Sequence, residues 1–120
     1  MNLNTVEIKA FIPTKDFALS KAFYEAVGFT CKYADREIAY FNKGDCSFLL
    51  QNFQPAALPD ELMMHLLVEN VDDWHAHLIR ERITERFHVR MSEPRNQPWG
   101  MRDFELFDPS KVLWRIAQNI

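Results

Sequence analysis

Apolar and polar residues follow two repeated patterns along this 120-residue chain. Every second residue is apolar over 6–12, which predicts a strand with one face on a core. Asp16 can cap a helix whose apolar residues recur every three or four positions to Val27, and Gly28 is a typical helix stop. Strand-like runs follow over 29–34, 38–42 and 47–52. The first half is thus predicted to have the order βαβββ.

The second half repeats this order. A strand over 63–68 precedes a helix over 71–83 that begins with two aspartates, the sign the helix dipole favours there. Further strands are expected over 86–91, 102–107 and 112–117, with loops over 94–100 and 108–111. Residues 54–61 contain two prolines and have the composition of a linker. We therefore predict one α+β domain over 1–120, with modules over about 1–53 and 62–120.

Composition limits the kinds of binding partner to expect. The 48% apolar residues are ample for a core, and ten Phe with three Trp make either the core or a pocket aromatic. A net charge of −3 without a basic block argues against nucleic acid and anionic membrane as partners. The first residues do not read as a signal peptide and no apolar run is long enough for a membrane span, so a cytoplasmic location is expected. Cys31 and Cys46 are expected to be reduced thiols.

Three stretches resemble the motifs of one family. Residues 16–24 read Asp-Phe-Ala-Leu-Ser-Lys-Ala-Phe-Tyr, and Val27-Gly28-Phe29 follow. This is similar to the first-helix signature of the glyoxalase and bleomycin-resistance family, Asp-x-x-x-Ser-x-x-Phe-Tyr then Leu-Gly-Phe. Residues 66–72 resemble the strand-to-helix entry of its second module, and residues 97–104 with Asp108-Pro109 resemble its closing β-hairpin. The hairpin is most similar to bleomycin resistance proteins, the metal-free branch of the vicinal oxygen chelate superfamily. The usual Asp-Pro-x-Gly turn here ends in Ser110-Lys111.

The resemblance implies two modules whose mixed sheets curl around a cleft that a homodimer completes. It also implies where a metal would bind. The four ligand positions fall at Lys9 or Ala10, at Gln51 or Asn52, at Met63 and at Arg115. These positions supply an ammonium or methyl group, an amide, a thioether and a guanidinium. Such a set does not hold a divalent cation, so no metal and no other cofactor is expected.

A pocket for a small organic ligand is implied instead. Its expected lining comes from strands on both modules and from one loop: Phe48, Gln51, Met63, His65, Trp99, Arg102 and Arg115. An indole suits planar ligands, and a guanidinium suits carboxylates or amides. Each residue also has a structural interpretation: His65 as a buried hydrogen-bonding group, Trp99 as a loop anchor or dimer contact, and the arginines as partners of nearby acids.

Three functions remain open from the sequence, of which a pure interaction module is the third. The first is sequestration of an amphiphilic or aromatic ligand, with bleomycin-type antibiotics as the class that the resemblance suggests. The second is a metal-independent lyase, isomerase or hydrolase in which His65 and Glu105 carry protons. No catalytic motif is found, so catalytic residues stay unassigned. A ferredoxin-like dimeric barrel is the rival fold, although it would not explain residues 97–104.

Overall fold

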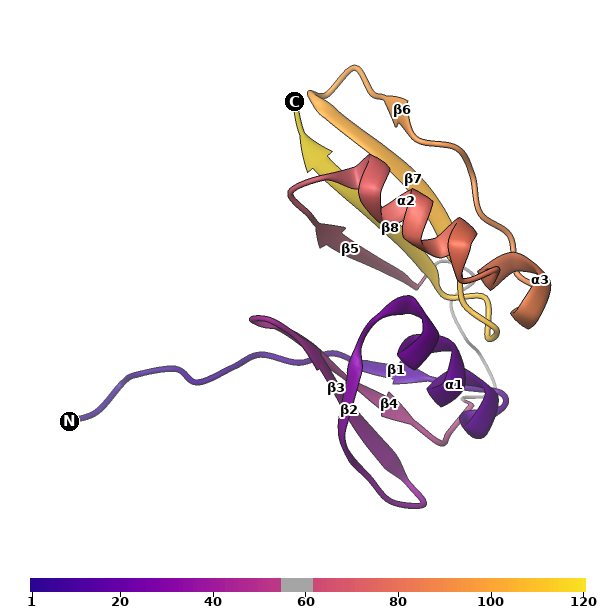
Figure 1. Cartoon of the computed structure of the whole chain (residues 1–120). Helices are drawn as coiled ribbons and strands as arrows, with labels where there is room; N and C mark the ends of the chain where they lie inside the picture. Colours follow the sequence, from indigo (N-terminus) through magenta and orange to yellow (C-terminus); the bar gives the residue numbers. More distant parts are fainter. Residues whose placement is uncertain (55–61) are drawn as a thin grey trace.

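The computed structural model describes residues 1–54 and 62–120, and Figure 1 shows two modules one above the other. The first module contains β1 (Phe11–Pro13), α1 (Phe17–Val27), β2 (Thr30–Ala34), β3 (Ile38–Lys43) and β4 (Cys46–Gln51). The second contains β5 (Met63–Leu67), α2 (Val71–Arg80), α3 (Ile83–Phe87), β6 (Arg95–Asn96), β7 (Met101–Phe107) and β8 (Leu113–Asn119). The α+β class and the paired modules are therefore confirmed.

The two sheets have the same topology. Their strand orders are β1-β4-β3-β2 and β5-β8-β7-β6. In each sheet the first strand pairs in parallel with the last strand of its module, and the other pairs are antiparallel. The helices begin as the sequence predicts, since Asp16 accepts a hydrogen bond from the Leu19 amide and Asn70 accepts one from the Asp73 amide. No helix among the described residues is long and apolar enough to cross a membrane.

An aromatic core joins the two modules. Tyr24 of α1, Phe48 of β4 and Trp114 of β8 are each at most 5% exposed and pack ring against ring. The Tyr24 hydroxyl donates to Asp108 Oδ2 at 2.6 Å and accepts from Trp114 Nε1 at 2.9 Å. Burial raises the pKa of Tyr24 well above its ordinary value, and burial also raises the pKa of Asp108. This network connects the first helix to the closing hairpin of the second module.

Two predicted strands are wrong. The strand over 6–12 is reduced to β1, and residues 1–10 form an arm without regular secondary structure. The strand over 86–91 does not form as predicted. Residues 86 and 87 belong to α3, which Arg82 and His88 bound in left-handed conformations (φ 55° and 53°), and Met91 makes an isolated antiparallel bridge with Leu106. Phe87 is buried as the last residue of this helix. The alternation of apolar residues that begins at Phe87 is therefore not the pattern of a strand.

The remaining elements shift at their ends. The helix predicted to reach residue 83 ends at Arg80, and the loop predicted over 94–100 contains the two-residue strand β6. All but Gln54 of the predicted linker over 54–61 lies outside the described residues. Cys31 and Cys46 are free, the first half-buried and the second exposed.

Candidate functional site

The second sheet has two chemically different faces. Along β7, Phe104 and Leu106 point into the core and are 1% exposed. Asp103 and Glu105 alternate with them and therefore project from the opposite side. We call this side, which faces away from α2, the outer face of the second sheet. Arg115 lies on it as well, because it is paired with Glu105 in the register of β7 and β8.

A network of charge-assisted hydrogen bonds lies on this face. Arg115 donates to Asp103 Oδ2 at 3.2 Å and to Glu105 Oε1 at 2.9 Å. Gln97 Nε2 donates to the other Asp103 oxygen at 2.9 Å. Asp103 is 2% exposed, whereas the Arg115 side chain is 24% exposed. The guanidinium is therefore held in one orientation while part of it still reaches solvent.

The network borders a cavity of about 380 Å³. Ser92 and Glu93, from the segment that leads into β6, line it together with Arg95 of β6 and the network residues. Three carboxylates and two guanidiniums thus converge on a volume that suits a small molecule.

Apolar surface adjoins the network on β5. Met63 and Leu67 are 53% and 52% exposed, and His65 between them is paired with Arg115 in the register of β5 and β8. Since alternate residues of a strand share a face, these three side chains lie on the outer face too. The outer face therefore offers an apolar strip beside fixed charges, which is the chemistry of a site for an amphiphilic ligand.

Three residues of the predicted lining, Met63, His65 and Arg115, lie together on the outer face. Gln51 lies on the first sheet, paired with Ile38, and is half-buried. Phe48 does not line an open pocket. It is 1% exposed and stacks on Phe41 with ring centroids 5.5 Å apart, because even-numbered positions of β4 point into the core.

Arg102 also departs from the prediction. It lies on the helix side of β7, where it bonds the Asp72 carboxylate of α2 through its Nε and Nη2 atoms at 2.9 to 3.2 Å. The hydrogen bond from Arg102 to Asp72 is the main cause of the lowered pKa of Asp72. Arg102 and Arg115 therefore do not flank one cavity. Each arginine is instead paired with acidic side chains.

Trp99 occupies the turn between β6 and β7. The Gly100 amide donates to the Gln97 carbonyl at 3.2 Å and closes this turn, and the indole is 61% exposed. Trp99 is thus two residues along the chain from Gln97, whose side chain belongs to the network.

Sequence reasoning missed Asp103 and Gln97 as site residues. Both fall within the hairpin motif at residues 97–104, and Asp103 is two positions from Glu105 on the same strand. That spacing places both acids on one face of their strand.

The residues at the superfamily's metal positions do not fit a metal. Lys9 Nζ lies 3.1 Å from Glu7 Oε1, Arg115 is bound to two carboxylates, and Met63 supplies a thioether. Across residues 1–54 and 62–120 no three His, Cys, Asp or Glu side chains are grouped closely enough to hold a metal ion.

The paired βαβββ modules define a vicinal-oxygen-chelate type of fold. The profile of the glyoxalase, bleomycin resistance protein and dioxygenase superfamily matches residues 3–116, so the chain belongs to that superfamily. A bleomycin resistance protein from Klebsiella pneumoniae is 28% identical over 114 residues, covering 90% of this chain and 88% of the relative.

Solved structures give the same result for the fold. A bleomycin-binding protein complexed with bleomycin aligns with a TM-score of 0.78 at 24% identity, over 97% of this chain and all of the other. The bleomycin-binding protein of Streptomyces verticillus, complexed with copper(II)-bleomycin, aligns with a TM-score of 0.80 at 17% identity, over 99% and 100% of the two chains. The resemblance to the bleomycin resistance branch is thus confirmed.

Proposed function

We propose that this protein binds and sequesters a small amphiphilic organic molecule on the outer face of the second sheet. The names of its relatives make bleomycin-type glycopeptides the first ligands to test. The Arg115 network would orient polar groups of the ligand, while Met63 and Leu67 would contact its apolar part.

The observation that carries this proposal is the position of Asp103. A carboxylate that is only 2% exposed costs free energy unless it is paired, yet it lies on the face of the sheet that the core does not use. Its partners, Arg115 and Gln97, border the 380 Å³ cavity with it. Rigid polar groups beside an apolar strip are typical of ligand pockets, where a few placed donors and acceptors fix orientation.

The proposal includes a homodimer in the cytoplasm. Phe11 on the first sheet and Met63 and Leu67 on the second are each more than half exposed, and they lie on the edge strands β1 and β5, where a second copy can pack. A two-fold partner would cover these strands and close each cavity from its open side. Nucleic acid and membranes are not proposed as partners, in keeping with the net charge of −3.

Turnover is less well supported than binding. Glu105, one of the two proton carriers expected of an enzyme, is held by Arg115 at 2.9 Å. One oxygen of this carboxylate is thereby engaged with Arg115 rather than directed at a bound molecule. We therefore propose sequestration rather than catalysis.

Calorimetric titration with a bleomycin-type glycopeptide, free of metal, tests this function. We expect saturable binding of one ligand per chain. The ligand should remain chemically unchanged on prolonged incubation. Chemical conversion of the ligand would favour the enzyme, and heats no larger than dilution would count against the proposed ligand class.

A further inference from the structure

A second cavity, of about 350 Å³, lies where the chain leaves α3 and where β7 turns into β8 (Figure 1). We call it the turn cavity. Its apolar walls come from Val89, Phe107 and Pro109, which are all half-buried. Within the described chain it shares no lining residue with the cavity on the outer face of the second sheet. The two cavities are therefore separate sites.

Three side chains that carry nitrogen donors line the turn cavity as well. They are His88, Arg90 and Lys111, and all three are exposed. The Arg90 guanidinium lies over the ring of Phe107, with its central carbon 4.6 Å from the ring centre. This contact holds the guanidinium against the apolar wall, and the N–H groups at its edge can still donate.

The positive charges of this cavity are not neutralised within the described residues. Neither Arg90 nor Lys111 forms an ion pair with an acid of residues 1–54 or 62–120. Arg86 of the neighbouring helix α3, in contrast, is paired with Glu81 at 3.3 Å. The charge of the turn cavity is thus available to an anion from outside the chain.

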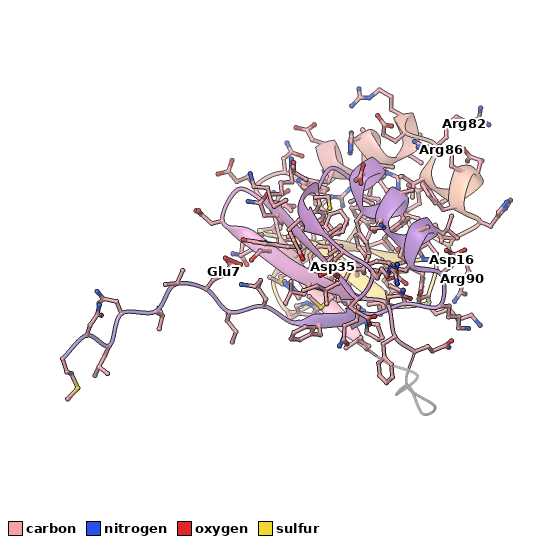
Figure 2. The ribbon with its side chains drawn as sticks, turned by 90° about the horizontal axis from the view of Figure 1, so that it is seen from below. Glu7, Asp16, Asp35, Arg82, Arg86 and Arg90 are labelled. Atoms are coloured by element: carbon pink, nitrogen blue, oxygen red, sulfur yellow. The ribbon has the colours of Figure 1, made fainter. Side chains whose placement is uncertain are left out.

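The nearby acids are engaged elsewhere. Asp108 lines the cavity but is 2% exposed, and its Oδ1 accepts from two backbone amides of its own turn while its Oδ2 accepts from Tyr24. Figure 2 shows Arg90 on the side of the molecule away from the N-terminal arm, with Asp16 labelled beside it. Asp16 caps α1 by accepting the Leu19 amide at 3.1 Å.

The backbone of Lys111 has a conformation that favours glycine. Its φ is 70°, and its amide donates to the Asp108 carbonyl at 3.0 Å to close the turn. His88, with a φ of 53°, is another of the three non-glycine residues with positive φ in the described chain. Such conformations persist only where the surroundings hold them, and they gather at ligand sites. Because glycine would suit this turn better, the ammonium group of Lys111 is explained by the cavity and not by the turn.

We propose that the turn cavity binds a small organic phosphate monoester. Arg90 and Lys111 contact the phosphate oxygens, and Phe107 and Pro109 contact the organic part. The two cations match the charge of about −1.5 to −2 on a phosphate monoester at pH 7 better than the single charge of a carboxylate. The guanidinium offers a planar fork of donors, and the ammonium acts as a point charge.

This inference does not rest on the proposed function, because the two sites are formed by different residues. His88 supplies a further donor, since an imidazole has an N–H group in either protonation state. The site would hold its ligand independently of any molecule on the outer face.

Two glycine variants test the site by calorimetric titration with phenyl phosphate. Lys111→Gly and Arg82→Gly each remove one positive charge at a left-handed position, with φ of 70° and 55°, but Arg82 does not line the cavity. Lys111→Gly should raise the dissociation constant at least about tenfold, because a charge-assisted contact is lost. Arg82→Gly should change it by less than about twofold, since exposed distant charges are screened. Circular dichroism verifies that both variants are folded.

Two further variants locate the phosphate. Arg90→Gln should weaken binding as strongly as Lys111→Gly, whereas Arg95→Gln, in the outer-face cavity, should leave it unchanged. Equal dissociation constants for Lys111→Gly and Arg82→Gly would overturn the proposal. A loss confined to Arg95→Gln would place the phosphate in the other cavity and would overturn it too.

Two smaller probes test the chemical class of the ligand. Inorganic phosphate lacks a part that contacts Phe107 and Pro109, and benzoate carries a single charge. Both should bind wild-type protein more weakly than phenyl phosphate does. If either bound as tightly as phenyl phosphate, or if phenyl phosphate gave only heats of dilution, an organic phosphate would be wrong as the ligand of this cavity.

Discussion

Arg102 and Arg115 lie on neighbouring strands but project from opposite faces of the same sheet. Arg102 bonds Asp72 on the helix side, and Arg115 bonds Asp103 and Glu105 on the outer face. The two arginines therefore provide a matched pair for experiments, since the same substitution can be made on the two sides of one sheet.

Removal of the Arg115 charge should destabilise the fold. Asp103 is 2% exposed and, among the residues that the structure describes, would keep only Gln97 as a side-chain partner. Arg115→Met should therefore lower the free energy of unfolding by about 1–3 kcal/mol. Urea denaturation measures this loss. Adding Asp103→Asn to Arg115→Met should recover part of it, because the neutral amide needs no cation. If Arg115→Met alone were as stable as the wild type, the Arg115–Asp103 pair would contribute nothing to the free energy of unfolding.

The hydroxyl of Tyr24 should contribute to stability in a pH-dependent way. At pH 7 Tyr24→Phe removes the buried partner of the Trp114 indole and of Asp108 Oδ2, while Asp108 Oδ1 keeps the amides of Ser110 and Val112. This loss should cost about 1–3 kcal/mol. The raised pKa of Tyr24 keeps the folded phenol protonated, while in the unfolded chain it ionises near about pH 10. The stabilisation is therefore present below that pH and is lost as the pH rises above it.

The corresponding measurement is a series of denaturation curves between pH 7 and 11 for the wild type and Tyr24→Phe. The difference in unfolding free energy between them should narrow above about pH 10, since only the wild type carries this phenol. A difference that stays constant across the series would contradict the assignment.

The fold could be predicted from sequence wherever local chemistry agreed with packing. Asp16 and Gly28 bound α1 as expected, because capping and a positive φ of 127° are local requirements. The strand over 6–12 could not be predicted correctly, since its alternation is real but the surface for Val6 and Ile8 is not in the described chain. Left-handed His88 ends α3 with no glycine to signal it.

The candidate site was only partly predictable. Family motifs located Arg115 and Met63, but which face a residue takes depends on register. A shift by one position moves a side chain to the other side of the sheet, and Arg102 and Phe48 both fell on the side of the core. The sequence offered Glu105 and Asp103 as partners for either arginine, and the pairing of β7 with β8 assigns both acids to Arg115.

Two tryptophans should respond differently to truncation. Trp114→Ala should cost about 3–5 kcal/mol, because Trp114 is 5% exposed and packs within the aromatic core. Trp99→Ala, in an exposed turn, should change stability by less than about 0.5 kcal/mol. Thermal unfolding of both variants measures the contrast, and a comparable loss for Trp99→Ala would make that residue part of the scaffold.

Purified protein should contain little metal. The side chains at the superfamily's ligand positions include a lysine, a methionine and an arginine, so zinc, nickel, manganese and iron should each fall below about a tenth of an equivalent. Elemental analysis of protein prepared without chelator measures the content of these four metals. A stoichiometric amount of any of these metals would place a metal site where none is expected.

The most direct test of the central claim is calorimetric titration of a bleomycin-type glycopeptide into Arg115→Lys and Arg102→Lys. Lysine keeps the positive charge for the local acids but loses the planar fork of donors. If the ligand binds on the outer face, Arg115→Lys should weaken affinity by about 1–2 kcal/mol, whereas Arg102→Lys should bind like the wild type. Equal affinities for all three proteins, or a loss confined to Arg102→Lys, would contradict the proposed site.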